Sequence, residues 1–178
     1  MPRTRQAPPK PFTSALRLLA RRAYSVAEMR RALSRRSDSV AAVEEAIVRL
    51  RQIGYLDDQK FADHQASALR RNRAFGPRRI VRELKAKGVN YSFIQAAVER
   101  AFAEVGESEL LEQVLTKKVR NLHLPLTRSR LSSLCRSLLR QGFRGDDIMK
   151  AVRARPELRP VADDVNVLDM EEEAAGSE

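Results

Sequence analysis

The feature that most constrains the fold is a helical pattern that the chain repeats three times, at intervals of 51 and 54 residues. Five positions of the first copy, from Met29 to Ile47, recur from Ile80 to Val98 and again from Leu134 to Val152 without a gap. Four of the five positions are apolar in every copy. The fifth position is Ser37, Gly88 and Gly142 in turn. Self-similarity at a fixed period is typical of a modular array that presents an extended surface rather than one enclosed pocket.

Start and stop signals divide each copy into three helices. Apolar spacings of three and four residues dominate, and no run alternates in the manner of a β-strand. Ser25 and Glu28 have the spacing of a capping box at a helix start. Pro77 suits the first turn of a helix, and Gly88 suits the left-handed residue that ends one. Further candidate caps are Asp57 or Asp58, and Asn90.

These signals predict an all-α fold of three tandem three-helix repeats, covering residues 12–56, 57–105 and 106–155. A unit this small is only marginally stable alone, so we expect neighbouring repeats to bury what one repeat leaves exposed. The result would be an elongated, curved array, whose hand the sequence leaves open. Disorder is predicted for the basic, proline-rich residues 1–11 and for residues 156–178, which contain prolines and an acidic tail.

The predicted folded part is more basic than the net charge of +11 suggests. Residues 163–178 hold seven of the 23 acidic residues and no basic one, so residues 1–162 carry 34 basic against 16 acidic residues, or +18. Arginine outnumbers lysine 27 to 7, and a guanidinium group binds phosphate or carboxylate in a bidentate manner. This composition predicts a polyanionic partner, either nucleic acid or a protein with an acidic groove.

Basic residues concentrate on the second helix of each repeat. Arg31, Arg82 and Arg136 are equivalent in the three copies, and Arg78, Arg82 and Lys85 share one helical stripe. Ordinary pairs such as Arg79–Glu83 explain any single arginine as part of a solvated face, but such pairs cannot neutralise an excess of +18. The candidate partner-binding residues are Arg30, Arg31, Arg35, Arg36, Arg70, Arg71, Arg73, Arg78, Arg79, Arg82, Lys85, Lys87 and Arg136. Because most of them belong to the first two repeats, the sequence places the partner there.

No catalytic or metal-binding pattern is evident in the sequence. The two histidines, His64 and His123, lie 59 residues apart, and Cys135 follows the core position Leu134. Adjacent carboxylates at a helix start, such as Asp57-Asp58, normally serve as cap and dipole partner rather than as an acid–base pair. We therefore expect a protein that is not an enzyme and that uses no cofactor or metal ion.

The sequence also predicts where the protein resides. One cysteine excludes an internal disulfide framework, and no apolar run reaches the ~18–20 residues that a membrane span requires. An arginine-rich start is typical of organellar transit peptides, but the prolines at positions 2, 8, 9 and 11 oppose an amphipathic helix there. A cytoplasmic protein without membrane association is predicted.

The central residues resemble the bacterial RecX regulatory proteins. The specific part of the resemblance runs from Gly54-Tyr55-Leu56-Asp57-Asp58 through Gly76-Pro77 to Lys87-Gly88-Val89. The outer repeats agree through Tyr24-Ser25 and Gly142-Phe143. The resemblance covers residues 15–155, which is nearly all of the predicted folded part.

This resemblance implies three three-helix repeats that regulate the RecA recombinase. It implies binding along the helical groove of the RecA–single-strand DNA filament and inhibition of ATP hydrolysis, strand exchange and co-protease activity. It implies no catalytic residues. Ser37 departs from the family pattern, in which a glycine commonly ends that helix. The alternative is a stand-alone DNA-binding or architectural protein, because three-helix units of this size resemble helix-turn-helix modules. We expect the protein to be a monomer.

Two roles are open for the acidic residues 163–178: a solubilising tail, or a polyanion mimic that occupies the basic face. On the second hypothesis, deleting 163–178 is expected to strengthen filament and DNA binding at low salt, where charge interactions are least screened. Titrations of the full and truncated chains would check this expectation. Unchanged affinity would leave only the solubilising role.

Overall fold

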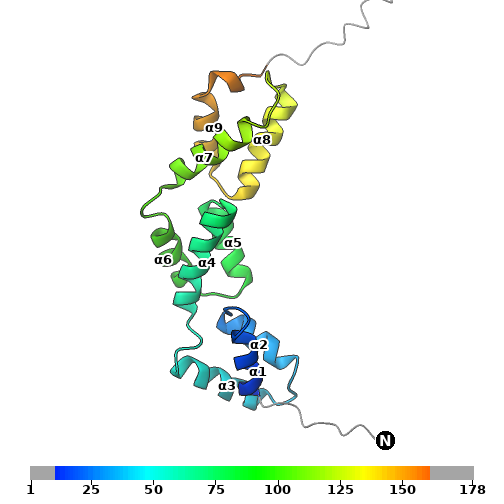
Figure 1. Ribbon diagram of the computed structural model, residues 1–178, viewed down its shortest axis with the longest axis vertical. Helices are drawn as coiled ribbons and strands as arrows, with labels where there is room; N and C mark the ends of the chain where they lie inside the picture. The colour runs from blue at the N-terminus through cyan, green and yellow to red at the C-terminus, as the bar shows by residue number, and fades with distance from the viewer. Residues whose placement is uncertain (1–10, 161–178) are drawn as a thin grey trace, which may run out of the picture.

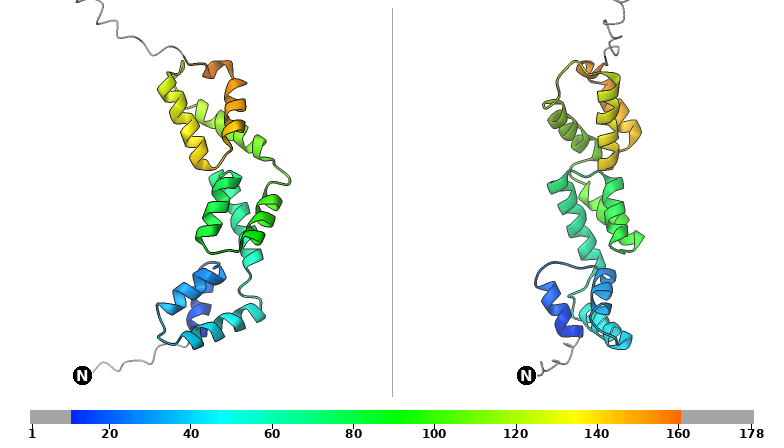
Figure 2. Two further views of the ribbon diagram at one scale, coloured as in Figure 1. Left: turned by 180° about the vertical axis from the view of Figure 1, so that it is seen from behind. Right: turned by 90° about the vertical axis from the view of Figure 1, so that its right-hand side faces the viewer.

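The computed structural model describes residues 11–160 of the chain, which form an elongated, bowed row of helices (Figure 1). Nine α-helices and one 3-10 turn make up these residues, and no strand occurs among them. In chain order the elements are α1 (Pro11–Leu19), α2 (Val26–Ser34), α3 (Val40–Gln52), α4 (Asp58–Arg73), α5 (Pro77–Ala86), α6 (Tyr91–Ala101), α7 (Glu107–Val119), α8 (Arg128–Gln141), α9 (Gly145–Arg153) and η1 (Pro156–Leu158). The predicted all-α repeat fold and its elongated, curved shape are confirmed (Figure 2).

Several helices begin at the capping residues that the sequence predicts. The Ser25 hydroxyl accepts a hydrogen bond from the Glu28 amide, and the Glu28 carboxylate accepts one from the Ser25 amide, which completes the capping box of α2. Asp57 caps α4 and Asn90 caps α6, while Pro77 is the first residue of α5. Because a side-chain cap contributes about 1 kcal/mol, these residues fix the starts of helices that are only 9 to 16 residues long.

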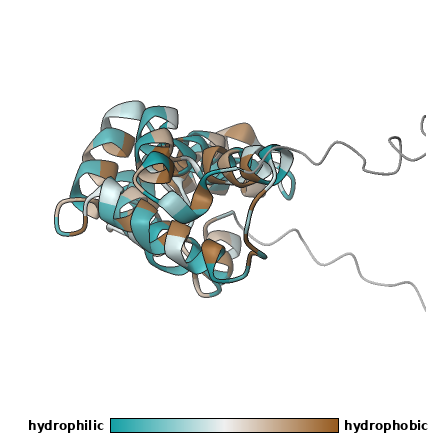
Figure 3. Ribbon diagram, turned by 90° about the horizontal axis from the view of Figure 1, so that it is seen from above, coloured by the Kyte–Doolittle hydropathy of each residue, from teal (hydrophilic) through white to brown (hydrophobic). Residues whose placement is uncertain are grey.

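Each group of three helices encloses its own hydrophobic core. The helices that can be followed in Figure 3 carry both hydrophilic and hydrophobic segments, as amphipathic helices do. The repeated apolar positions of the sequence lie in these cores: Met29, Leu33, Val43 and Ile47 in the first, Ile80, Leu84, Ile94 and Val98 in the second, and Leu134, Leu138, Ile148 and Val152 in the third. Below, the first, second and third repeat denote α1–α3, α4–α6 and α7–α9. The predicted limits of the repeats, 12–56, 57–105 and 106–155, stay predictions.

The repeats share little apolar surface, contrary to the expectation that neighbours bury one another's exposed faces. Phe102 packs against both the second and third cores, and Ala74 packs against the third. Within residues 11–160, the first and second cores have no residue in common. Apart from Ala74, Phe102 and Leu158 of η1, each core is formed by residues of its own repeat, so the repeats are joined mainly by polar contacts between helix ends.

The second helices of the repeats lie end to end, and α8, α5 and α2 form a column along the concave side of the bow (Figure 2). At the start of α5, the amides of Gly76 and Arg78 donate to the carbonyls of Gln141 and Gly142 at the end of α8, at 2.8 and 3.2 Å. Amides at a helix start and carbonyls at a helix end lack partners within their own helix, and these bonds satisfy both. The two helix dipoles are thereby aligned head to tail.

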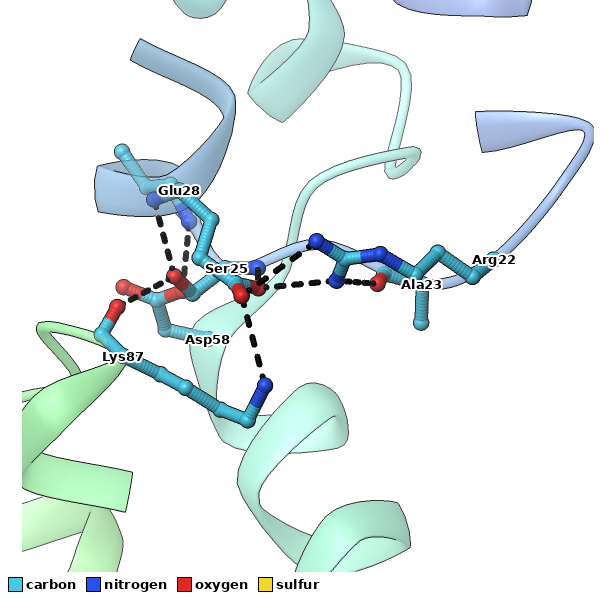
Figure 4. Close-up of polar contacts among 7 residues, drawn as sticks. Arg22, Ala23, Ser25, Glu28, Asp58 and Lys87 are labelled. Atoms are coloured by element: carbon cyan, nitrogen blue, oxygen red, sulfur yellow. Dashed lines mark hydrogen bonds and ion pairs between the residues drawn. The ribbon is translucent and has the colours of Figure 1, made fainter. Parts of the chain in front are cut away.

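Similar end-to-end contacts join α5 to α2 (Figure 4). The Ser25 hydroxyl donates to the Lys87 carbonyl at 2.6 Å, at the end of α5. The Asp58 carboxylate accepts from the Val26 amide at 2.8 Å. Asp58 was predicted as a cap or dipole partner of its own helix, and the structure shows that it also caps α2 of the preceding repeat.

Two glycines allow these helix ends to approach closely. A Cβ on Gly142 would overlap the Arg79 amide nitrogen, and a Cβ on Gly88 would lie 2.5 Å from the Cβ of Ala27. Both glycines also have a positive φ, of 97° and 76°. Ser37 holds the equivalent position of the first repeat, and its φ is not positive. Within residues 11–160, the end of α2 at Ser37 forms no backbone hydrogen bond with another repeat, unlike the ends of α5 and α8. The departure of Ser37 from the pattern therefore has a physical reason.

The ordered chain extends further at both ends than the sequence predicts. Disorder is predicted for residues 1–11 and 156–178, but Pro11 begins α1 and Pro156–Leu158 forms the turn η1. Leu158 is only 1% exposed, because this turn packs on α9 and places the side chain in the third core. Residues 1–10 and 161–178, with the acidic tail, lie outside the described residues.

Candidate functional site

Seven exposed arginines form a stripe along the column of α8, α5 and α2. Residues four apart lie on the same face of a helix, and the seven are spaced by four or eight residues within each helix. We call them the arginine stripe: Arg128, Arg136 and Arg140 on α8, Arg78 and Arg82 on α5, and Arg31 and Arg35, with Arg31 on α2 and Arg35 as its C-terminal cap.

Contacts at both junctions show that the three helix faces line up. Arg82 Nη2 lies 3.4 Å from the Arg140 carbonyl oxygen, which links α5 to the end of α8. Ala86, one turn beyond Arg82, lines the same cleft as Arg31 and Arg35. At 1.5 Å per helical residue, the stripe is about 50 Å long with its junctions included.

The arginines of the stripe form no ion pair within residues 11–160, whereas some other cations of the same helices do. Among residues 11–160, none of the seven arginines has a carboxylate within 4.0 Å. Three other predicted site residues do form ion pairs: Arg30 with Glu44, Arg79 with Glu83 at 2.8 Å, and Lys87 with Glu28 at 3.2 Å. Other exposed cations of residues 11–160, such as Arg17 and Lys117, also lack an ion pair. What distinguishes the stripe is that its seven arginines follow one column of helices.

The remaining predicted site residues are not members of the stripe. Arg36 lines the cleft described below. Lys85 is exposed, with its Nζ 5.1 Å from the centroid of the Tyr91 ring. Arg70, Arg71 and Arg73 occupy the last turn of α4, where the Nε of Arg70 is buried without a hydrogen-bond partner. A binding role for these residues stays a prediction.

A cleft of about 570 Å³ opens where the first repeat meets the end of α5. Four arginines line this arginine cleft: Arg22, Arg31, Arg35 and Arg36. The guanidinium carbon of Arg22 lies 3.6 Å from the centroid of the Tyr24 ring, and Arg22 also pairs with Glu28 at 3.1 Å. A cation–π contact and an ion pair therefore hold Arg22 in place.

Glu28 is the one carboxylate that lines the arginine cleft, and it is already engaged. Its side chain is 14% exposed and lies between Arg22 and Lys87 (Figure 4). Burial alone would raise the pKa of Glu28, but hydrogen bonds from Arg22, the Ser25 amide and Lys87 outweigh it and lower the pKa below its ordinary value. Four arginines and one ionised carboxylate leave the lining of the cleft with a net charge of +3.

A larger groove of about 690 Å³ involves the same two repeats but has a different character. Val48, Leu56 and Phe93 give it an apolar lining, and its charged residues are Asp57, Asp58 and Arg51. Two carboxylates against one guanidinium would not attract a polyanion. The candidate site for a polyanion is therefore the arginine stripe with its cleft.

Three residues of this surface are missing from the sequence-based candidates: Arg22, Arg128 and Arg140. The signal for Arg128 and Arg140 was present, because they lie eight residues before and four after Arg136. Arg22 lies between α1 and α2, and no periodicity indicates which way such a residue points. The prediction that the partner lies along the first two repeats covers only part of the stripe, since three of its arginines belong to the third.

Other chemistry finds little support in the part of the chain that the structure describes. No group of three His, Cys, Asp or Glu side chains there could hold a metal ion. His64 and His123 are exposed, and burial raises the pKa of the half-buried Cys135 thiol, which disfavours the reactive thiolate. No helix between residues 11 and 160 combines the length and the apolar character needed to cross a membrane.

Fold and surface together define a tandem helical-repeat protein with an extended basic face. Models of the RecX family match it twice, the first three-helix domain over residues 12–50 and the second over residues 57–98. The regulatory protein RecX of Stenotrophomonas maltophilia K279a is 30% identical over 162 residues, which cover 83% of this chain and 88% of that protein. The RecX of Deinococcus radiodurans is 32% identical over 146 residues, or 82% and 68%. The chain belongs to the RecX family of regulatory proteins.

Solved structures of RecX proteins have the same fold. The crystal structure of RecX from Lactobacillus salivarius matches with a TM-score of 0.67 at 18% identity, over 82% of this chain and 94% of that one. A second crystal structure, of a regulatory protein RecX, matches with a TM-score of 0.68 at 21% identity, over 82% and 71%. At these identities the likeness concerns the fold alone.

Proposed function

We propose that the protein is a non-enzymatic regulator that binds the RecA–single-strand DNA filament along its helical groove. The observation that supports this proposal is the arginine stripe, seven exposed arginines without ion pairs along about 50 Å of the α8–α5–α2 column. This column lies on the concave side of an elongated molecule (Figure 2). A bowed, basic rod suits a helical, polyanion-containing groove better than a flat or enclosed site. The predicted cytoplasmic location and monomeric state belong to this proposal.

Contact with several adjacent protomers would explain how such a protein inhibits RecA. A rod that binds one arrangement of the filament better than others shifts the population towards that arrangement. ATP hydrolysis, strand exchange and co-protease activity all require the filament to change or to remain accessible, so each would fall. The polar junctions between repeats fix the curvature of the rod and hence the arrangement that it favours.

The test is the single-strand-dependent ATPase activity of RecA, measured with increasing amounts of the protein and with excess competitor DNA. We expect inhibition below one protein per RecA protomer, because one rod spans several protomers, and we expect it to persist with competitor. Inhibition that excess DNA abolishes would contradict the proposal. It would favour the alternative, a DNA-binding protein that only sequesters the strand.

A further inference from the structure

We infer that the arginine cleft is a binding site for the phosphodiester backbone of single-stranded nucleic acid. This inference rests on the proposed function, since the strand it would contact is the one in the filament. It adds a specific place, the junction of the first and second repeats, and a specific chemical group, the phosphate. Three properties of the cleft favour such a ligand: its charge, its preorganisation and its continuity with the rest of the stripe.

The charge in the cleft is available to a ligand. Arg31 and Arg35 have no carboxylate within 4.0 Å in the described part of the chain, and the same holds for Arg36. The carboxylate of Glu28 does not compensate them, because Arg22 and Lys87 already pair with it. An anion that enters the cleft therefore meets three guanidinium groups without displacing an existing ion pair.

Parts of the cleft are also held in place before any ligand binds. Tyr24 and Glu28 fix the guanidinium group of Arg22. Arg31 and Arg35 are one helical turn apart, about 6 Å along the axis, so both can engage one strand from the same side. Guanidinium groups bind phosphate oxygens in a bidentate manner. Arginines held in fixed positions therefore favour a bound phosphate over loosely associated counterions.

The surroundings of the cleft favour a polymer of phosphates over a small anion. At about 570 Å³ the cleft can hold more than one phosphate group, and Ala86 connects it to Arg82 and Arg78 on the neighbouring helix. A row of charges that continues beyond the cleft along one column of helices suits a chain with one phosphate per nucleotide. Arg22 covers one face of Tyr24, so the lining offers phosphate contacts rather than an open aromatic platform for bases.

The test uses the full chain without RecA and follows the fluorescence anisotropy of a labelled 20-nucleotide oligo-dT. We expect Arg31→Ala/Arg35→Ala to weaken binding about 10- to 100-fold at low salt and to reduce the slope of log K against log salt by about 1.4, because each lost single-strand phosphate contact removes about 0.7. Alanine has a high helix propensity, so α2 should remain folded, which circular dichroism verifies. The matched control is Arg17→Ala/Arg51→Ala, which removes two exposed cations of the first repeat that do not line the arginine cleft and have no ion pair within residues 11–160.

Two results would overturn the inference. One is an equal loss of oligo-dT binding in both double variants, which would indicate general charge rather than a site. The other is displacement of the oligonucleotide by poly-glutamate of equal charge as effectively as by unlabelled oligo-dT, which would assign the cleft to an acidic protein segment. Because RecA is absent, neither result bears on the proposed regulation of RecA, which the ATPase assay tests separately.

Discussion

Replacing Gly142 with alanine is expected to cost about 2–4 kcal/mol of folding free energy and to loosen α8 from α5. A residue with a side chain at the φ of 97° costs roughly 1–2 kcal/mol. The new Cβ would also overlap the Arg79 amide nitrogen, so α5 must move away from α8. That movement would break the bonds of Gly76 and Arg78 to the end of α8, each worth about 1 kcal/mol. Urea unfolding would measure the loss, and small-angle scattering would report the change in shape.

Gly54→Ala is the matched control for this prediction. Gly54 has a φ of 76°, but a Cβ built there would meet no atom within 4 Å. The control variant therefore introduces the backbone strain but no overlap of the new Cβ with another helix. We expect it to cost only about 1–2 kcal/mol of folding free energy and to leave the shape of the molecule unchanged. If Gly142→Ala cost no more than Gly54→Ala, the close approach of α8 and α5 would not stabilise the protein.

The comparison of Gly88, Gly142 and Ser37 shows how far the sequence predicts the fold. The prediction that Gly88 is a left-handed residue at a helix end is confirmed, and the same local rule explains the positive φ of Gly142. Their second role, contact with Ala27 and Arg79, involves residues more than 60 positions away in the chain. No local pattern contains that information, because it depends on how one repeat sits on the next. The helices were therefore predictable, whereas the polar nature of the junctions was not.

In the candidate site, too, the sequence predicts local features but not the contacts between repeats. Equivalent positions in the repeats were enough to identify Arg31, Arg82 and Arg136, and the structure places all three on one exposed stripe. Lys87 belongs to the same basic cluster in the sequence, yet its side chain pairs with Glu28 across a junction. Ion pairs between repeats depend on tertiary contacts. The sequence alone therefore does not distinguish a basic residue that is paired at a junction from one on the free surface.

Removing the three arginines of the third repeat, in the variant Arg128→Ala/Arg136→Ala/Arg140→Ala, is expected to weaken oligo-dT binding by about 100-fold at low salt. Three lost phosphate contacts should also reduce the salt slope by about 2, at 0.7 for each contact. The prediction follows from the continuity of the arginine stripe, which extends through Arg82 and the Arg140 carbonyl onto α8. Anisotropy titrations at several salt concentrations would measure both quantities.

The control for this variant is Lys117→Ala/Arg120→Ala/Arg153→Ala, which removes the same charge from exposed residues of α7, its C-terminal cap and α9. A uniform electrostatic effect would weaken binding equally in both triple variants, whereas a strand that follows the column should be affected only by the first. A partner confined to the first two repeats would tolerate both triple variants. If the α8 variant binds almost as well as the unmodified protein, the binding surface does not extend beyond Arg78. The partner would then lie along the first two repeats, as the distribution of basic residues along the sequence predicts.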